Sequence, residues 1–91
     1  MPKVKVLFFA SAREAAGVSS THVELESRQD EGGVEVGSTA KSLLAHLSAA
    51  YPYLDFDKDQ ISVAVNKDYI EGDVVLKEGD EVALLPPIAG G

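Results

Sequence analysis

Hydrophobic and polar residues alternate at the start of the chain, over Lys3–Phe9, before the run becomes wholly apolar. This alternation predicts a β-strand with one face in the core. A second alternating stretch, Ser20–Glu26, predicts a strand that pairs with the first as its hairpin partner. Between them, Ser11 precedes Glu14 by three residues, a capping-box pattern that predicts a short helix ended by Gly17.

Apolar residues in the middle of the chain recur at the spacing of an α-helix. A helix is predicted from a cap at Ser38 or Thr39 to about Tyr51, where Pro52 stops it. Its apolar face is formed by Ala40, Leu43, Leu44, Leu47 and Tyr51. The preceding segment, Ser27–Gly37, is polar, contains glycine and has no period, so it predicts a surface loop of variable structure.

Short strands are predicted at Ile61–Val65 and Val82–Leu85, with a turn at Asn66–Asp68 that leads back through Tyr69 and Ile70. The order of elements predicts one α+β domain over residues 1–91, with one main helix across a mixed sheet of four to five strands. A β-grasp, ubiquitin-like arrangement satisfies this order. In that arrangement the first and last strands lie side by side in the middle of the sheet.

Strand parity divides the two faces of this sheet. Val4, Val6 and Phe8 should enter the core, since Lys3 and Lys5 point to solvent. Four apolar residues share the parity of residues that point to solvent: Leu7 and Phe9 that of the two lysines, and Ala83 and Leu85 that of Glu81. They predict an apolar patch on the helix-free face, of the kind that marks a protein partner. The alternatives are a β-bulge that turns some of them inward or a loop that covers them.

Charge and composition narrow the function classes. The 91 residues carry a formal net charge of −7 and no cysteine, which excludes disulfides, thiolate metal sites and cysteine nucleophiles. A phosphate backbone would be repelled, so nucleic acid is not an expected partner. The acidity either suits a basic protein or only keeps the chain soluble. Neither a signal peptide nor a membrane span is recognised, so we expect a cytoplasmic protein.

Motifs for self-sufficient catalysis are missing from the sequence. His22 and His46 are isolated, and the carboxylates at Asp55, Asp57 and Asp59 lack the closing glutamate of a calcium loop. We therefore expect no metal, no cofactor bound by this chain and no active site of its own.

The chain ends on ALLPPIAGG, with a tail at residues 86–91. Pro86 and Pro87 cannot continue a ladder of hydrogen bonds, so they lift the chain off the sheet. The six residues reach about 20 Å when extended. Gly90 and Gly91 have no side chains and can thread a narrow channel. If ATP activates a carboxylate here, the α-carboxyl of Gly91 is the loading point, because no cysteine is available.

Four stretches, VLFFASAREAAG, VAVNKDYI, KEGDEVALLPP and PPIAGG, together resemble the small, sulfur-carrying subunit of molybdopterin synthase over nearly the whole chain. The resemblance implies a β-grasp fold and a flexible tail. It also implies that an activating enzyme adenylates Gly91 with ATP and that a sulfurtransferase system converts it to a thiocarboxylate. The sulfur then enters the large subunit's active site and attacks the cyclic pyranopterin monophosphate precursor of the molybdopterin dithiolene.

Residue by residue, the resemblance makes Gly91 the sulfur-bearing position and Gly90 its threading neighbour. It places Phe9, Tyr69 and Leu85 against the large subunit, in a heterotetramer whose catalytic groups belong to the partner. Three alternatives stay open: a sulfur carrier for thiamine or tRNA thiolation, a ubiquitin-like protein modifier, and an interaction module with an inert tail.

Overall fold

The computed structural model describes residues 2–58 and 60–87, which form five strands and two helices. In chain order these are β1 (Lys3–Phe8), α1 (Ala10–Ala16), β2 (Ser20–Glu24), α2 (Ala40–Ala50), β3 (Ser62–Val65), β4 (Asp68–Tyr69) and β5 (Glu81–Leu85).

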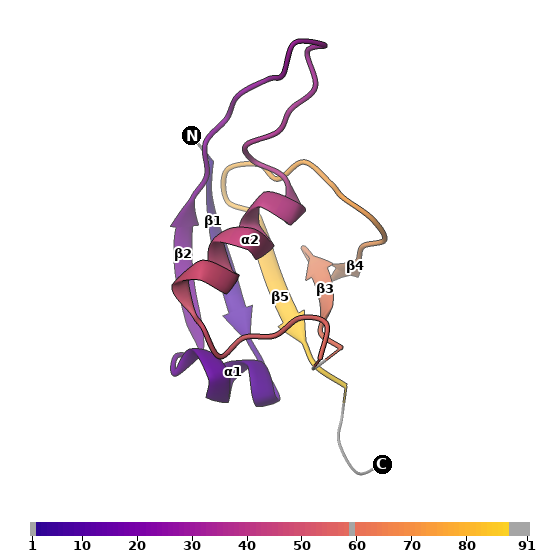
Figure 1. Cartoon of the computed structure of the whole chain (residues 1–91). Helices are drawn as coiled ribbons and strands as arrows, with labels where there is room; N and C mark the ends of the chain where they lie inside the picture. Colours follow the sequence, from indigo (N-terminus) through magenta and orange to yellow (C-terminus); the bar gives the residue numbers. More distant parts are fainter. Residues whose placement is uncertain (1, 59, 88–91) are drawn as a thin grey trace.

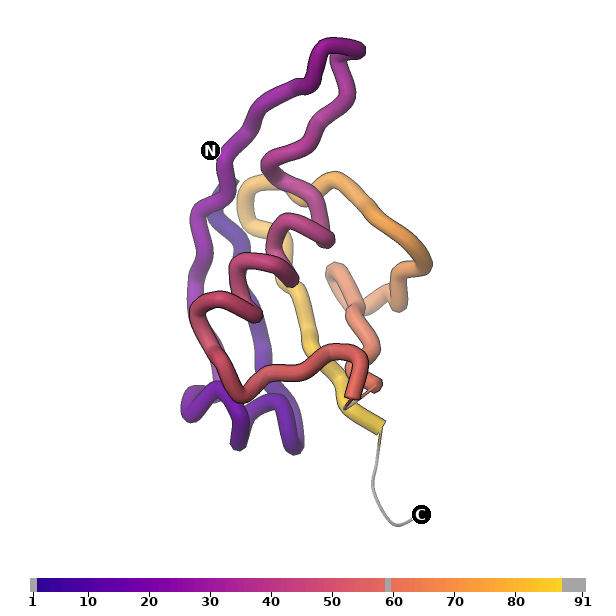
Figure 2. The backbone as a smooth tube through the Cα atoms, viewed as in Figure 1, coloured from indigo at the N-terminus to yellow at the C-terminus, as the bar shows by residue number. Residues whose placement is uncertain are grey.

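The strands form one mixed sheet in the order β2-β1-β5-β3-β4. β1 and β5 are parallel neighbours at its centre, and the other three pairings are antiparallel. α2 lies across one face of the sheet, while α1 lies at the end where β1 and β5 finish (Figure 1). The predicted β-grasp fold, with its first and last strands adjacent, is confirmed. The smooth backbone trace shows the same two layers and a loop that projects from the opposite end (Figure 2).

The core lies between α2 and the sheet and uses the residues that parity and helical spacing predict. Val4, Val6 and Phe8 of β1 are buried, as are Leu43 and Leu47 of α2. The ring of Phe8 meets Tyr51 edge-on, with centroids 5.3 Å apart, a preferred aromatic geometry. No helix in the described part of the chain is long and apolar enough to cross a membrane.

The two helices begin in different ways. Thr39 caps α2 as predicted, because its hydroxyl accepts a hydrogen bond from the Ser42 N–H at 3.3 Å. The capping box predicted for α1 is wrong. The N-cap of α1 is Phe9, which offers no acceptor side chain, so Ser11 already lies inside the helix. The predicted end at Gly17 is correct, since this residue has a φ of 79° and its N–H bonds the Arg13 carbonyl.

Residues 26–37, here called the finger, form a hairpin-like projection rather than an irregular loop (Figure 1). A β-bridge pairs Gln29 with Glu35. At the tip, one carboxylate oxygen of Asp30 accepts the N–H groups of Gly32 and Val34. At the base, a Cβ on Gly37 would collide with the backbone carbonyl of Glu26, so the two legs close where only glycine fits.

Glu35 joins the finger to the start of α2. Its Oε1 accepts hydrogen bonds from the backbone N–H groups of Arg28, Gly37 and Ser38 and from the Ser38 hydroxyl, at 3.0 to 3.2 Å. Desolvation is the largest single influence on the pKa of this carboxyl and raises it, but the four hydrogen bonds together favour its ionised form. They outweigh the desolvation and hold the pKa below its ordinary value of 4.5.

The order of the finger base is therefore expected to depend on pH. Because the pKa of Glu35 is lower in the folded chain than its ordinary value, the ionised carboxylate stabilises the folded state at pH values above that ordinary pKa. This stabilisation is lost as the pH falls through the lower, folded-state pKa. The amide shifts of Gly37 and Ser38, followed by NMR during acidification, should move together with a midpoint below 4.5. In the matched control Glu35→Gln these shifts should not titrate. A midpoint at or above the ordinary value would show that the carboxylate does not hold the base.

Candidate functional site

Outward-facing apolar residues line up across four strands on the face of the sheet that lacks α2. Leu7 of β1 is the register partner of Ala83 in β5. Ala83 is in turn opposite Ala64 of β3, and Ala64 is opposite Tyr69 of β4. Because register partners point to the same side, these four side chains form one row. The ladder between β1 and β5 is continuous from Lys5 to Phe8, so the bulge considered above does not occur there.

An apolar surface, here called the docking face, consists of Leu7, Ala83 and Tyr69 from this row together with Phe9 and Leu85. Leu7, Ala83 and Leu85 are half-buried, whereas Phe9 is 44% and Tyr69 71% exposed. No loop therefore covers the two aromatic rings. Strand register places Leu7, Tyr69 and Ala83 on the helix-free face, and Leu85 shares the parity of Ala83. Phe9 directly follows β1 and is exposed. Contact of the five residues with a partner stays a prediction.

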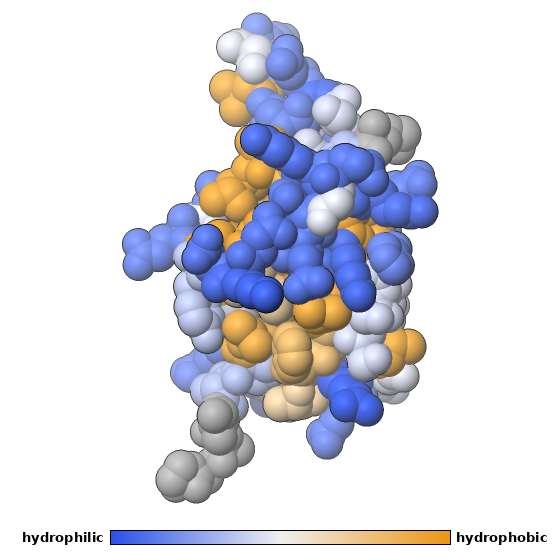
Figure 3. Space-filling view, turned by 180° about the vertical axis from the view of Figure 1, so that it is seen from behind, coloured by the Kyte–Doolittle hydropathy of each residue, from blue (hydrophilic) through white to orange (hydrophobic). Residues whose placement is uncertain are grey.

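The docking face occupies only one half of the sheet surface. Two residues before Leu7 in β1, Lys5 lies between its register partners Glu81 of β5 and His22 of β2. Figure 3, which views the molecule from behind, shows apolar colour gathered in the lower part of this face and hydrophilic colour across its middle. An apolar area rimmed by charge is typical of a protein-binding surface.

Phe9 owes its exposure to the turn that follows β1. Its N–H still bonds the Leu84 carbonyl at 3.3 Å, and its own carbonyl accepts the N–H groups of Ala12 and Arg13. The next residue, Ala10, has a φ of 48°, a left-handed conformation that costs a non-glycine residue about 1–2 kcal/mol. The chain thus turns sharply from strand into α1 directly after the ring that faces outward.

The tail leaves the sheet beside this face. Leu85 is the last paired residue of β5 and lies opposite Ser62 of β3. Pro86 is half-buried and Pro87 is exposed, and neither belongs to a strand. Proline lacks the N–H that a ladder requires, which explains the end of pairing. The predicted threading residue Gly90 and loading residue Gly91 lie outside the described residues.

Ala64 lies in the same row, between Ala83 and Tyr69, but was not predicted there. It is only 4% exposed, although its register places it on the face away from α2. The signal was present in the two-residue turn at Asn66–Lys67, which sets Val65 opposite Asp68 and therefore Ala64 opposite Tyr69.

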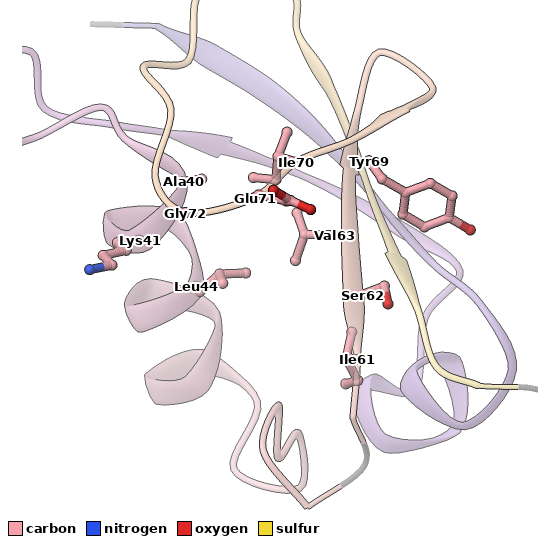
Figure 4. A pocket seen from close by; sticks show the side chains of 10 residues that line it. All are labelled: Ala40, Lys41, Leu44, Ile61, Ser62, Val63, Tyr69, Ile70, Glu71 and Gly72. Atoms are coloured by element: carbon pink, nitrogen blue, oxygen red, sulfur yellow. The ribbon is translucent and has the colours of Figure 1, made fainter.

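On the other side of β3, a hollow of about 380 Å³ separates α2 from the β3–β4 edge. Figure 4 shows Leu44, Val63 and Ile70 around this hollow, with Tyr69 pointing away from it. Of its charged lining residues, Lys41 lies in α2 and Glu71 in the loop after β4. Within residues 2–58 and 60–87, no group of three or more His, Cys, Asp or Glu side chains could hold a metal ion. Asp55 instead accepts the Lys58 N–H at 2.9 Å.

Comparison with known proteins identifies the family. A family model described as the ThiS family matches residues 6–91. The chain belongs to the ThiS family. Among curated members, it is 38% identical to the molybdopterin synthase sulfur carrier subunit of Chlamydomonas reinhardtii, over 98% of this chain and 99% of the relative. It is 35% identical to the protein of the same name from Mycobacterium tuberculosis, over the full length of both. The resemblance recognised in the sequence is confirmed.

Solved structures agree on the fold of this ThiS-family chain. SAMP1 from Haloferax volcanii superposes with a TM-score of 0.75 at 26% identity, over 98% of this chain and 99% of that one. A putative molybdopterin converting factor subunit 1 from Pyrococcus furiosus gives 0.74 at 31% identity, over 97% and 100%. The complex of subunits 1 and 2 of molybdopterin-converting factor from Helicobacter pylori shares the fold with a TM-score of 0.65 at 23% identity, over 98% and 99%.

Proposed function

We propose that this ThiS-family chain carries sulfur for molybdopterin synthesis on the α-carboxyl of Gly91. The carboxylate attacks the α-phosphate of ATP, pyrophosphate leaves, and an acyl-adenylate forms. A sulfide equivalent from a sulfurtransferase displaces AMP and leaves a thiocarboxylate. The sulfur then attacks a carbon of the cyclic pyranopterin monophosphate precursor, where a C–S bond forms as a C–O bond breaks. Water hydrolyses the resulting thioester, which leaves the sulfur on the product and returns Gly91 to the carboxylate. Two such transfers supply the two sulfurs of the dithiolene.

The observation that carries this proposal is the position of the Pro86–Pro87 exit beside an exposed apolar face. A partner that binds the docking face is also positioned to receive the tail. Leu85 of the docking face is the last residue of β5, and the tail follows it directly. The names of the curated relatives support the same role. Since the sequence contains no cysteine, sulfur cannot be carried on a side-chain thiol.

The proposal divides the chemistry between chains. This chain supplies the nucleophilic sulfur and its delivery, and the large subunit supplies the catalytic groups, in a heterotetramer with two carriers at the ends of a large-subunit dimer. An activating enzyme uses the ATP, so this chain needs no cofactor of its own. The same reasoning places the cycle in the cytoplasm, where ATP and the activating enzyme are available.

The experiment that tests the proposal is the intact mass of the chain after incubation with a ThiS-family activating enzyme, ATP and a sulfur source. The expected result is a mass gain equal to one sulfur replacing one oxygen, located in the C-terminal peptide. Adding the large subunit and the pyranopterin precursor should then reverse the gain and yield dithiolene product. A loaded chain that gives no product here, but sulfurates a thiamine or tRNA precursor, would move it to another pathway.

The second candidate is a protein modifier, favoured by the similarity to SAMP1, a small archaeal modifier protein. In that case a lysine amine of a target attacks the acyl-adenylate, AMP leaves, and an isopeptide bond joins Gly91 to the target. The same incubation distinguishes the two functions if lysine-containing proteins are included. Lysine-linked adducts without a thiocarboxylate would favour the modifier.

A further inference from the structure

The negative charge of this chain is concentrated far from the docking face. The finger carries four carboxylates and one arginine, and residues 71–80 carry four carboxylates and one lysine. Together they hold a formal charge of −6 out of the total of −7. Figure 1 shows the finger and the turn that leads into β5 at the end of the molecule opposite the end of β5. The finger and this turn therefore lie away from the docking face, whereas Asp68 and Glu71 lie close to Tyr69 in the sequence.

Two exposed valines lie within this acidic end. Val34 of the finger is 59% exposed and Val75 is 52% exposed. Both line one hollow of about 230 Å³, together with Val74 and the acidic residues Glu35 and Asp73. Isolated exposed valines are common on protein surfaces. Here two segments distant in sequence bring them to the same hollow, which can hold an aliphatic side chain.

The floor of this hollow is held by hydrogen bonds to α2 and the residues before it. Thr39 and Val75 form a β-bridge, the Ala40 N–H donates to the Val74 carbonyl at 2.8 Å, and the Leu76 N–H donates to the Ser38 carbonyl at 2.7 Å. Asp73 accepts the N–H of Lys41 at 2.8 Å. The surface is therefore formed before any partner arrives, which lowers the entropy that binding must offset.

We infer that the finger and residues 71–80 form a second docking surface for a basic segment of another protein, one that inserts an aliphatic side chain between Val34 and Val75. Charge complementarity selects this occupant. A nucleic acid, an anionic membrane and a second copy of this chain all carry negative charge and would be repelled. Lysine and arginine around the aliphatic residue would meet the carboxylates, which steer association.

Because the two surfaces lie at opposite ends of the molecule, the second can be occupied while the docking face and the tail are engaged elsewhere. The inference does not rest on the sulfur chemistry of Gly91. An inert tail would leave the second docking surface unchanged. Failure of the sulfur-carrier proposal can therefore be distinguished from failure of this inference.

The test is an NMR titration of the ¹⁵N-labelled full chain with three short peptides. The first has two lysines on each side of a leucine, the second replaces the leucine by glycine, and the third replaces the lysines by glutamates. The leucine–lysine peptide should shift the amides of Val34, Thr39 and Val75. It should bind about tenfold more tightly than the glycine peptide, as partial burial of a leucine predicts. The glutamate peptide should not bind.

Substitutions in the hollow test whether it causes the difference in affinity between the leucine and glycine peptides. The double variant Val34→Ser with Val75→Ser should bind the leucine and glycine peptides equally. The control Val18→Ser, at a valine 43% exposed outside the finger and residues 71–80, should keep the tenfold difference. Equal binding of both lysine peptides by the unmodified chain would overturn the inference, because charge alone would then account for binding without the hollow. Shifts centred on Phe9 and Tyr69 would overturn it as well.

Discussion

Removal of Gly91 is expected to abolish sulfur loading and transfer while leaving the fold intact. The shortened chain ends on a carboxylate about 3.5 Å further back. Displacement of a reacting group by about 1 Å can already cost about 100-fold in rate. We therefore expect a loss of at least about 100-fold in thiocarboxylate formation, measured by intact mass, and a similar loss in dithiolene synthesis.

Folding should not change, because the core cluster ends at Leu84. The free energy of unfolding in urea is expected to stay within about 0.5 kcal/mol of the unmodified chain. A chain extended by one further glycine is a useful control, since it keeps the chemistry of the terminus and changes only its position. It should fold normally and also lose activity. Full activity of the shortened chain would refute the carrier function and favour a module with an inert tail.

Strand parity was sufficient to predict which residues leave the core, but not how they assemble. Leu7 and Ala83 could be assigned to the outer face from the lysines and the glutamate that share their parity. Their alignment with Ala64 and Tyr69 depends on register, which the turn at Asn66–Lys67 and the parallel pairing of β1 with β5 determine. Parity is a local property, whereas register requires the partner strand.

The finger could not be predicted from hydrophobic periodicity, because its order comes from side-chain hydrogen bonds to the backbone. Asp30 and Glu35 together accept five backbone N–H groups. Such bonds depend on where the loop brings the amides, and they leave no period in the sequence. Likewise, the apparent capping box at Ser11 and Glu14 has the correct spacing. It fails because α1 already begins at Ala10, directly after the hydrogen bond between Phe9 and Leu84.

The net charge is a property of composition, but its direction in space is a property of the fold. From the sequence, an excess of seven negative charges suited a basic partner anywhere on the molecule. The structure places the acidic finger at the opposite end of the molecule from the apolar docking face (Figure 1), so the two proposed binding surfaces can be tested separately. A variant on one surface can therefore serve as the control for a variant on the other.

A negative charge on the docking face is expected to weaken binding of the large subunit strongly. Phe9→Asp replaces an exposed aromatic ring, and Leu85→Asp places a carboxylate where β5 ends beside Ser62. Exposed aromatic anchors at the centre of an interface commonly contribute 2 kcal/mol or more, which corresponds to a factor of about 30 in the dissociation constant. We expect at least this loss for Phe9→Asp, measured by calorimetry with the large subunit.

Val75→Asp is the matched control, because it introduces the same charge at a side chain that is 52% exposed, compared with 44% for Phe9. It should leave binding of the large subunit unchanged. Phe9→Asp should unfold at nearly the same urea concentration as the unmodified chain, since its ring lies outside the core cluster. If Val75→Asp weakened the complex as much as Phe9→Asp, the large subunit would have to contact both ends of the molecule. If neither variant weakened it, the docking face would not be the surface that binds the large subunit and delivers the tail.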